Sequence, residues 1–356
     1  MKFEDFYIIE LCNYINPDTQ KIQALMQEDL DYSYILGKLL INRTGALAYY
    51  TLSNNGLMEK LNREFKNALK NEYISCKDKT LEFFSMLGEI GALLQNAKFK
   101  YALLKGSYLS KLFPLGTRTS NDIDIFIDSS GIDAITNLLN KNNFSQGYIR
   151  QNKFVPASRL EILTAQLNRG ETVPFIKPVA KKYYDYFEVD INLSFDYQAA
   201  KNNSGYSEML NRIEPTIKTK NGSLYTFSKE DFIIHLCCHL YKEATTYPWI
   251  SLDRDQGLYK YIDIYACVFK ENALFVEAFV KRVHQLGFSK ECHYAFAVLA
   301  KMYGGVFEKI RLLLANLSTT TLNTIYDPKT KKTYQYDMDL LDWIFCNSKK
   351  DYLYET

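Results

Sequence analysis

The chain has 356 residues, of which 47% are hydrophobic and 24% are charged, and its formal net charge is +2. This composition is ordinary for a folded globular protein, and it excludes an extended disordered chain, a dedicated DNA-binding protein and a polybasic membrane anchor. No apolar stretch approaches the ~18 residues of a transmembrane helix, and the N-terminus lacks the pattern of a signal peptide. The 7 cysteines are scattered without a C-x-x-C motif, so we expect reduced thiols in a cytoplasmic protein.

Residues 1–95 have the pattern of a helical region. Apolar side chains recur at helical spacing in two stretches: Ile35, Leu36, Leu39 and Leu40, and then Leu81, Phe84, Leu87, Ile90 and Leu94. Between these stretches, Asn54-Asn55-Gly56 predicts a turn that separates two helices. We find no residues with an evident chemical role in this region.

From residue 96 to 225 short β-rich runs alternate with helical ones. We predict strands over 101–104, 122–128 and 186–193, and helices over 107–113 and 132–141, the first of them ended by Pro114. Strands and helices mixed in this way indicate a domain built on one sheet, of the α/β or α+β class. Beyond 226 the chain is helical again, with helices predicted over 231–245 and 258–269.

The turn Gly106-Ser107 follows the first predicted strand and begins a helix. Glycine lets a backbone approach a ligand closely, and serine caps a helix whose N-terminal N–H groups suit a phosphate. Most such pairs are simply turns, so this pair becomes informative only beside other residues with a matching chemistry.

Two aspartates, Asp122 and Asp124, lie two positions apart on the next predicted strand. Such side chains share a face of the strand, so both carboxylates point the same way, while Ile123 and Ile125 point into the other layer. Two like charges this close repel unless a cation lies between them, and Mg²⁺ prefers oxygen ligands and accompanies phosphates. An isolated pair would more often face solvent on an edge strand, but here it directly follows a strand, a Gly-Ser turn and a helix.

A third carboxylate is needed for a site with two metal ions. Glu188 and Asp190 share one face of the strand predicted over 186–193. We choose Asp190, with Glu188 in reserve, to ligate a metal and to accept the proton of an attacking hydroxyl.

The run Lys105-Gly106-Ser107 followed by Asp122-Ile123-Asp124 resembles the signature of the polymerase-beta-like nucleotidyltransferase superfamily. Within it, the sequence is similar to a branch of uncharacterised bacterial nucleotidyltransferases with a Leu-Lys-Gly opening, an Arg before an Asp-Ile-Asp strand, and a later acid on a strand. The matching positions are Leu104-Lys105-Gly106, Arg118, Asp122-Ile123-Asp124 and Val189-Asp190-Ile191. Where the branch often has His after the third acid, this chain has Asn192. A later helix with His239 and Lys242, and one with Asp263, are also similar, so the resemblance covers roughly residues 80–275.

The resemblance implies an α+β fold with a small mixed-sheet core over 96–225, flanked by helical regions over 1–95 and 226–356. It also implies transfer of a nucleoside monophosphate from an NTP, with ATP as the first choice, to an acceptor with release of pyrophosphate. Asp122, Asp124 and Asp190 would bind two Mg²⁺ and carry the catalysis. Gly106 and Ser107 would hold the outer phosphates, and Lys105, Arg118 and Lys242 are further candidates for binding the nucleotide.

Other interpretations stay open at this point. The chain could be a non-catalytic nucleotide-binding or regulatory module that retains the fold, or an unrelated protein with a chance motif. His235 and His239 have the spacing of zinc ligands, but no Glu follows His235 and no third ligand is evident. The acceptor could be a small molecule, a nucleic-acid end or a protein side chain. A long nucleic acid is disfavoured because the weak net charge supplies few phosphate contacts.

Overall fold

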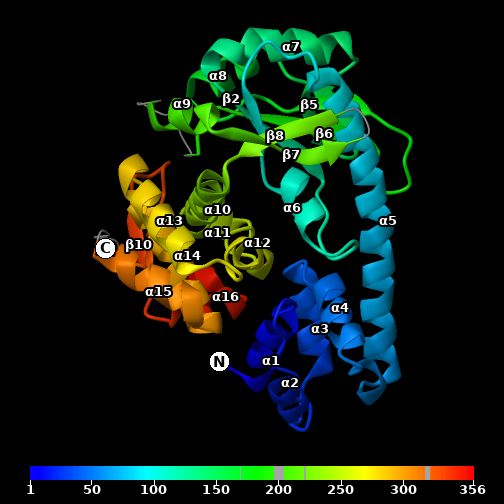
Figure 1. Ribbon diagram of the computed structural model, residues 1–356, viewed down its shortest axis with the longest axis vertical. Helices are drawn as coiled ribbons and strands as arrows, with labels where there is room; N and C mark the ends of the chain where they lie inside the picture. Colours follow the sequence, from blue (N-terminus) through cyan, green and yellow to red (C-terminus); the bar gives the residue numbers. More distant parts are fainter. Residues whose placement is uncertain (169, 196–203, 220–221, 317–320) are drawn as a thin grey trace. The chain divides into compact units, whose positions relative to one another are not determined.

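The computed structural model describes residues 1–168, 170–195, 204–219, 222–316 and 321–356 of an α+β protein (Figure 1). The chain divides into two compact units, one formed by Met1–Ser75 with Ile233–Thr356 and the other by Cys76–Phe232. The three regions expected from the sequence remain a prediction. None of the described helices has the length and apolar character that a membrane span needs.

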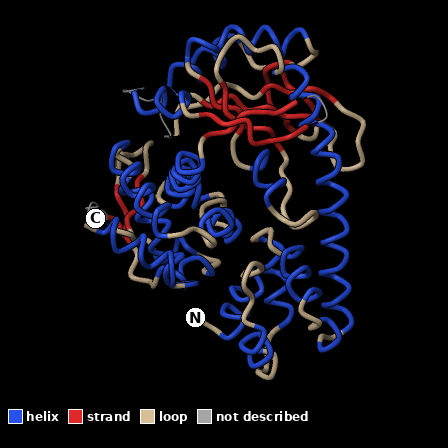
Figure 2. The backbone as a smooth tube through the Cα atoms, viewed as in Figure 1, coloured by secondary structure: helices blue, strands red, loops and turns tan. Residues whose placement is uncertain are grey.

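The unit Cys76–Phe232 is built on a mixed sheet with the strand order β1-β2-β6-β5-β3-β4 (Figure 2). β2 and β6 run parallel, and the other strand pairs described in this sheet are antiparallel. β7 and β8 form a separate antiparallel hairpin. The strands are β1 (Tyr101–Leu103), β2 (Asp122–Ile127), β3 (Ser145–Arg150), β4 (Lys153–Pro156), β5 (Phe175–Pro178), β6 (Tyr186–Asn192), β7 (Ile213–Thr219) and β8 (Gly222–Phe227).

Helices pack on this sheet and enclose its core. The elements are the second part of α5 (Arg63–Leu94), α6 (Gly106–Leu112), the 3₁₀ turn η2 (Ser129–Gly131), α7 (Ile132–Lys141), α8 (Arg159–Asn168) and α9 (Ser204–Asn211). The core joins apolar side chains of α5 and α7 to the odd-numbered residues of β2 and β6, such as Ile123, Ile125 and Val189. Each fully buried side chain of this kind contributes roughly 1.5–3 kcal/mol. Because strand side chains alternate, the even-numbered residues of β2 and β6 lie on the opposite face.

The other unit, Met1–Ser75 with Ile233–Thr356, is mostly helical. Its N-terminal elements are α1 (Phe3–Cys12), α2 (Thr19–Leu25), α3 (Tyr32–Ile41), α4 (Gly45–Asn54), η1 (Met58–Lys60) and the first part of α5. The later ones are α10 (Lys229–Ala244), which begins in the sheet unit, α11 (Tyr247–Ser251), α12 (Leu258–Val268), α13 (Ala273–Leu286), α14 (Ser289–Tyr303), α15 (Gly305–Ala315), β9 (Thr324–Tyr326), β10 (Thr333–Gln335), α16 (Leu340–Phe345), η3 (Lys349–Tyr352) and β11 (Tyr354–Glu355). The helices predicted over 231–245 and 258–269 correspond to α10 and α12, whereas the sequence pattern missed the small sheet β11-β10-β9.

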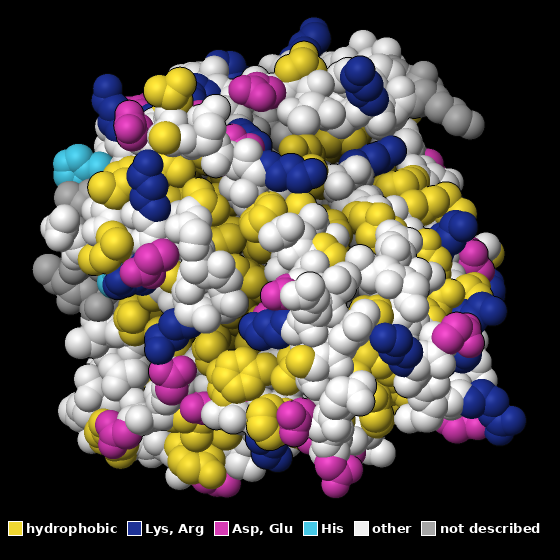
Figure 3. All heavy atoms as spheres, turned by 60° about the horizontal axis from the view of Figure 1, so that its bottom comes forward, with side chains coloured by type: hydrophobic (Ala, Val, Ile, Leu, Met, Phe, Trp, Pro, Cys, Tyr) yellow, Lys and Arg dark blue, Asp and Glu magenta, His cyan; other side chains and the backbone are white. Residues whose placement is uncertain are grey.

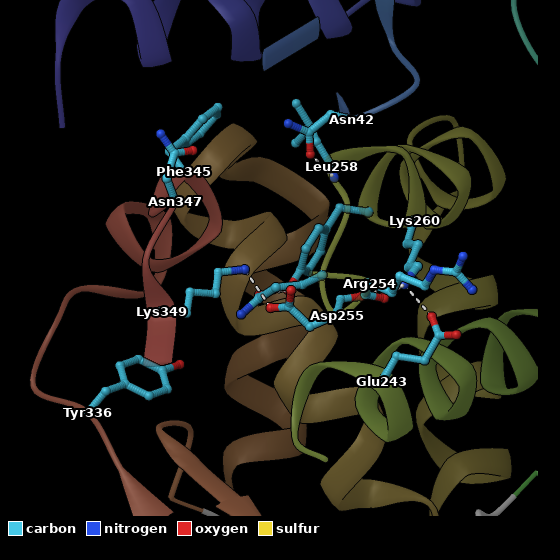
Figure 4. Close-up of polar contacts among 12 residues, drawn as sticks. Asn42, Glu243, Arg254, Asp255, Leu258, Lys260, Tyr336, Phe345, Asn347 and Lys349 are labelled. Carbon is cyan, nitrogen blue, oxygen red and sulfur yellow. Dashed lines mark hydrogen bonds and ion pairs between the residues drawn. The ribbon is translucent and has the colours of Figure 1, made fainter. Parts of the chain in front are cut away.

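Aromatic and charged side chains tie the C-terminal segment into the helical unit. Trp343 of α16 is fully buried and stacks on Tyr336, with ring centroids 3.9 Å apart. Lys349 Nζ lies 2.5 Å from Asp255 Oδ2, and both side chains are buried (Figure 4). Lys38 Nζ donates to the backbone carbonyl of Phe345 at 2.5 Å. Residues far apart in the sequence are thereby held in one core.

Candidate active site

Carboxylates of two adjacent parallel strands gather on one face of the sheet. In the register of β2 and β6, Asp122 lies opposite Glu188 and Asp124 lies opposite Asp190. Residues in register on neighbouring strands present their side chains on the same face. Asp124 is buried, and the other three acids are partly buried. The structure therefore brings the three predicted acids, and the reserve Glu188, onto one small surface.

The pKa values in this cluster reflect crowding of like charges. Burial, and then the charge of Asp124, raises the pKa of Asp122, although Lys105 and Ser120 act in the opposite direction. Burial and the charges of Asp124 and Asp122 raise the pKa of Asp190 well above its usual range. The pKa of Glu188 is raised by burial and by the same two aspartates. A cation among these groups would lower all three pKa values, because it stabilises the ionised form.

Protein donors already contact the most buried of these carboxylates. Lys105 Nζ lies 2.8 Å from Asp124 Oδ1, and Asn192 Nδ2 donates to the same oxygen at 3.3 Å. Lys105 precedes α6 and has a φ of +40°, a conformation that is strained for a residue with a side chain. Lys105 therefore belongs to the acid cluster rather than only to the core.

Gly106 and Ser107 form the first turn of α6, next to the loop that leads into β2. A Cβ atom on Gly106 would lie 2.3 Å from Ser120 Oγ, so glycine is required by packing at this position. Ser120 Oγ in turn donates to Asp122 Oδ1 at 3.0 Å. Ser107 Oγ is buried and has no hydrogen-bond partner among the described residues. A buried hydroxyl in this state is a place where a ligand atom can be recognised.

The loop containing Arg118 is fixed by hydrogen bonds to its backbone. The Arg118 guanidinium donates to the carbonyl of Thr119, and Thr80 Oγ1, which donates to the Cys76 carbonyl at 2.7 Å, also lies 3.4 Å from the Arg118 carbonyl. The hydroxyl of Tyr184 donates to the carbonyl of Ser120 at 2.6 Å. The contacts described for Arg118 thus hold the loop before β2, and its binding of phosphate remains a prediction.

The remaining predicted residues lie in the helical unit. Lys242, His235 and His239 are on α10, and Asp263 is on α12. His239 Nε2 lies 3.4 Å from Glu243 Oε2, and Glu243 also forms an ion pair with Lys260 (Figure 4). A role of Lys242 in binding the nucleotide remains a prediction.

The acid cluster has the donor chemistry of a Mg²⁺ site, since carboxylate oxygens are the ligands that this ion prefers. Within the described parts of the chain, however, no three His, Cys, Asp or Glu side chains form a group that could hold a metal ion as they stand. Asp124 is turned to Lys105 and Asn192, and Asp122 is turned to Ser120. The residue types fit the ion, and its binding would require these oxygens to exchange their protein partners.

Sequence reasoning named Asn192 without giving it a role, and it assigned no role to Tyr184 or Glu171. Asn192 follows Asp190 by two positions on β6 and shares its face, so strand alternation could have assigned it to the cluster. The same alternation offers no signal for Tyr184, which lies outside the strands and acts through a backbone carbonyl. The charge of Glu171, which helps to raise the pKa of Asp190, comes from a loop that no sequence pattern places.

Comparison with known proteins gives one family match. The model of a family described as "Uncharacterised nucleotidyltransferase" matches residues 40–304. No curated protein matches the chain. Among solved structures, the chain is similar to the crystal structure of an antigenic nucleotidyltransferase-like protein from Paracoccidioides brasiliensis, with 12% identity and a TM-score of 0.36 over 67% of this chain and 94% of that one.

Proposed function

Since this chain belongs to the family of uncharacterised nucleotidyltransferases, we propose that it moves a nucleoside monophosphate from an NTP to an acceptor hydroxyl in a Mg²⁺-dependent reaction. The observation that carries the proposal is the register of β2 and β6, which puts Asp124 opposite Asp190 with Asp122 on the same face. Three carboxylates on one face have no evident structural use, because their mutual repulsion is unfavourable.

Each acid has a role in the proposed reaction. Asp122 and Asp124 would hold two Mg²⁺, with Asp190 as a further ligand. When bound, the metal would neutralise charge on the phosphates and on the carboxylates. Asp190 would also accept the proton of the acceptor hydroxyl, as a carboxylate that lies within hydrogen-bond reach of that hydroxyl can do.

The bonds that change follow from in-line phosphoryl transfer. The acceptor oxygen would form a bond to the α-phosphorus while the bond from that phosphorus to the oxygen bridging the β-phosphate breaks, and pyrophosphate leaves. The proton of the acceptor goes to Asp190. Positioning and charge neutralisation supply most of the rate in such reactions.

Residues around α6 would hold the triphosphate. The first turn of α6, which begins at Gly106, would lie against the phosphates, and the buried hydroxyl of Ser107 would offer a donor. Lys105, Arg118 and Lys242 would add positive charge, with Arg118 able to grip two oxygens at once.

We further propose ATP as the nucleotide, a small molecule or a protein as the acceptor, and the cytoplasm as the location. A long nucleic acid is disfavoured by the net charge of +2. On the face drawn in Figure 3, Lys and Arg side chains are scattered, with Asp and Glu among them, and do not form one basic stripe. The preferred base and the acceptor depend on the shape of the bound state.

The proposal is tested with α-labelled ATP, GTP, CTP and UTP, each with Mg²⁺ and either protein alone or a metabolite extract. Wild type is compared with Asp122→Asn/Asp124→Asn, and with Asp133→Asn as a control that removes one exposed carboxylate from α7. We expect labelled product and pyrophosphate from wild type and from the control only. If no NTP gives a product or binds to the wild type, the proposal is wrong.

One observation favours the alternative of a non-catalytic nucleotide-binding or regulatory module. Asp124 is already paired with an ammonium, as in a site that works without a metal. Calorimetry separates the two functions. Nucleotide binding that occurs without Mg²⁺ and persists in Asp124→Asn would support the module. Binding that is lost when Mg²⁺ is left out, or lost in Asp124→Asn, would support the enzyme.

A further inference from the structure

Lys105 occupies a position in the acid cluster that a cation would otherwise take. Its ammonium is 2.8 Å from Asp124 Oδ1, and the two side chains are 23% and 5% exposed. Asp124 is surrounded by like charges, since Asp122 is on its own strand and Asp190 lies opposite on β6. The structure thus places the ammonium of Lys105 against Asp124 at hydrogen-bond distance.

The backbone at Lys105 indicates that the side chain serves a purpose. With φ +40° and ψ −118°, Lys105 has a conformation that glycine adopts far more easily. Neighbouring hydrogen bonds fix this conformation, because Leu104 N donates to the carbonyl of Asp124 and Leu109 N donates to the carbonyl of Lys105. The backbone is therefore held in place, and only the flexible four-carbon side chain is able to turn away from Asp124.

The charge balance differs between a free metal ion and a metal–nucleotide complex. A free divalent ion that binds Asp124 must displace the ammonium and leave it beside a new positive charge, which is unfavourable. A metal–NTP complex carries net negative charge, so its phosphate oxygens receive the displaced ammonium in a charge-assisted hydrogen bond. The same lysine would thus oppose one ligand and favour the other.

We propose that Lys105 is a built-in counter-ion for Asp124, which the metal of a metal–NTP complex displaces and which then pairs with the triphosphate. This inference rests on the proposed function and deepens it. It makes the chain selective for metal–nucleotide complexes over free metal ions, and it gives the acid cluster a neutralising charge before the substrate arrives.

The test measures two affinities in the full-length protein. Free Mn²⁺ is titrated with electron paramagnetic resonance detection, and Mn²⁺ with α,β-methylene-ATP is titrated by calorimetry. The proteins are wild type, Lys105→Met, Lys105→Arg and Lys98→Met, the last removing an exposed lysine of the same unit. We expect Lys105→Met to bind free Mn²⁺ about tenfold tighter and the complex about tenfold more weakly than wild type. Lys98→Met should behave as wild type, and Lys105→Arg, which keeps the positive charge, should bind free Mn²⁺ more weakly than Lys105→Met does.

A merely structural role of Lys105 would lower both affinities together, and this result would overturn the proposal, as would an unchanged affinity for free Mn²⁺ in Lys105→Met. If Lys105→Met does not fold, Lys105→Gln, which retains a donor for Asp124 but not the charge, should show the same opposite changes. If wild type transfers nucleotide but the Lys105 variants bind free Mn²⁺ and its nucleotide complex as wild type does, the counter-ion role alone is rejected. Failure of wild type both to bind the Mn²⁺ complex and to transfer nucleotide would reject the proposed function as well.

Discussion

The hydroxyl of Tyr184 donates a 2.6 Å hydrogen bond to the backbone carbonyl of Ser120. Ser120 then uses its own hydroxyl to contact Asp122 at 3.0 Å. Burial raises the pKa of Tyr184, so its phenol keeps its proton and remains a donor over the working pH range. The position of the first acid thus depends on a tyrosine that does not touch it.

Replacement of Tyr184 by Phe is expected to lower nucleotide transfer through misplacement of Asp122. Loss of the hydrogen bond should reduce the free energy of unfolding by about 1 kcal/mol, whereas a small displacement of a catalytic group can lower the rate by about tenfold to a hundredfold. The measurements are kcat/KM and urea denaturation. Tyr186→Phe is the matched control, because it removes a hydroxyl that donates to the carbonyl of Asn152 at an exposed site. Equal rates in the two variants would contradict the prediction.

Asp190→Asn is expected to raise the stability of the metal-free protein while it abolishes transfer. The folded-state pKa of Asp190 is raised above its usual value near 3.8, so the folded protein binds this proton more tightly than the unfolded chain. Its contribution to stability is therefore full below the usual carboxyl pKa and is lost as pH rises through the raised value. In EDTA, wild type should melt lower at pH 8 than at pH 5, and Asp190→Asn should show a smaller difference.

The matched control for this prediction is Asp133→Asn, which changes an exposed carboxylate of α7 and should leave the pH dependence of Tm as in wild type. Added Mg²⁺ together with α,β-methylene-ATP should raise the Tm of wild type at pH 8 by mass action, but not that of Asp190→Asn. A lower Tm for Asp190→Asn than for wild type at pH 8 in EDTA would show that the carboxylate is not under repulsive strain.

Gly106→Ala is expected to destabilise the protein and to lower transfer, because the new Cβ would lie 2.3 Å from Ser120 Oγ and 2.4 Å from its Cβ. Overpacking of this kind typically costs about 1–3 kcal/mol. Ser120→Gly removes both clashing atoms, so the double variant should recover stability relative to Gly106→Ala. Transfer should stay low, since the contact with Asp122 is then lost. If the loss of stability in the double variant equals the sum of the losses in the two single variants, the steric explanation is wrong.

In the helical unit, Asp255→Asn is expected to lower the free energy of unfolding by about 3–5 kcal/mol, because it leaves the buried ammonium of Lys349 without its partner. The double change Asp255→Asn/Lys349→Met removes both charges and should lower it less. Urea denaturation measures both variants. The exposed ion pair of Lys332 with Glu355 provides the control, since removal of either partner should change stability by about 1 kcal/mol or less.

The acid strands could be predicted because their alternation is strong and local. The strand expected over 122–128 is observed at Asp122–Ile127, and the one over 186–193 at Tyr186–Asn192. The pairing of these strands could not be predicted, because it joins segments separated by more than 50 residues. Period-two alternation says which face a side chain takes, and only the register shows that Asp124 lies opposite Asp190.

Other elements depended on tertiary contacts that the sequence pattern does not encode. The helical spacing in α5 was assigned to a stripe that includes Leu81, but Leu81 is 49% exposed, and the neighbouring Phe83 and Met86 are buried. The hairpin of β7 and β8 was not predicted, although Leu224 of β8 packs in the same core as Leu87. No sequence pattern predicts the contact of Lys105 with Asp124, because the positive φ of Lys105 is visible only in the structure.

The burial of Trp343 in the core of the helical unit has a practical consequence for measuring the unfolding of this protein. The chain contains 2 tryptophans, Trp249 and Trp343, and both belong to the helical unit. Intrinsic tryptophan fluorescence therefore reports on that unit alone, because the sheet unit with its acid cluster contains no tryptophan. If the melting temperature from tryptophan fluorescence differs from the one from circular dichroism, the two units unfold separately. If the two melting temperatures agree, the units unfold as one cooperative body.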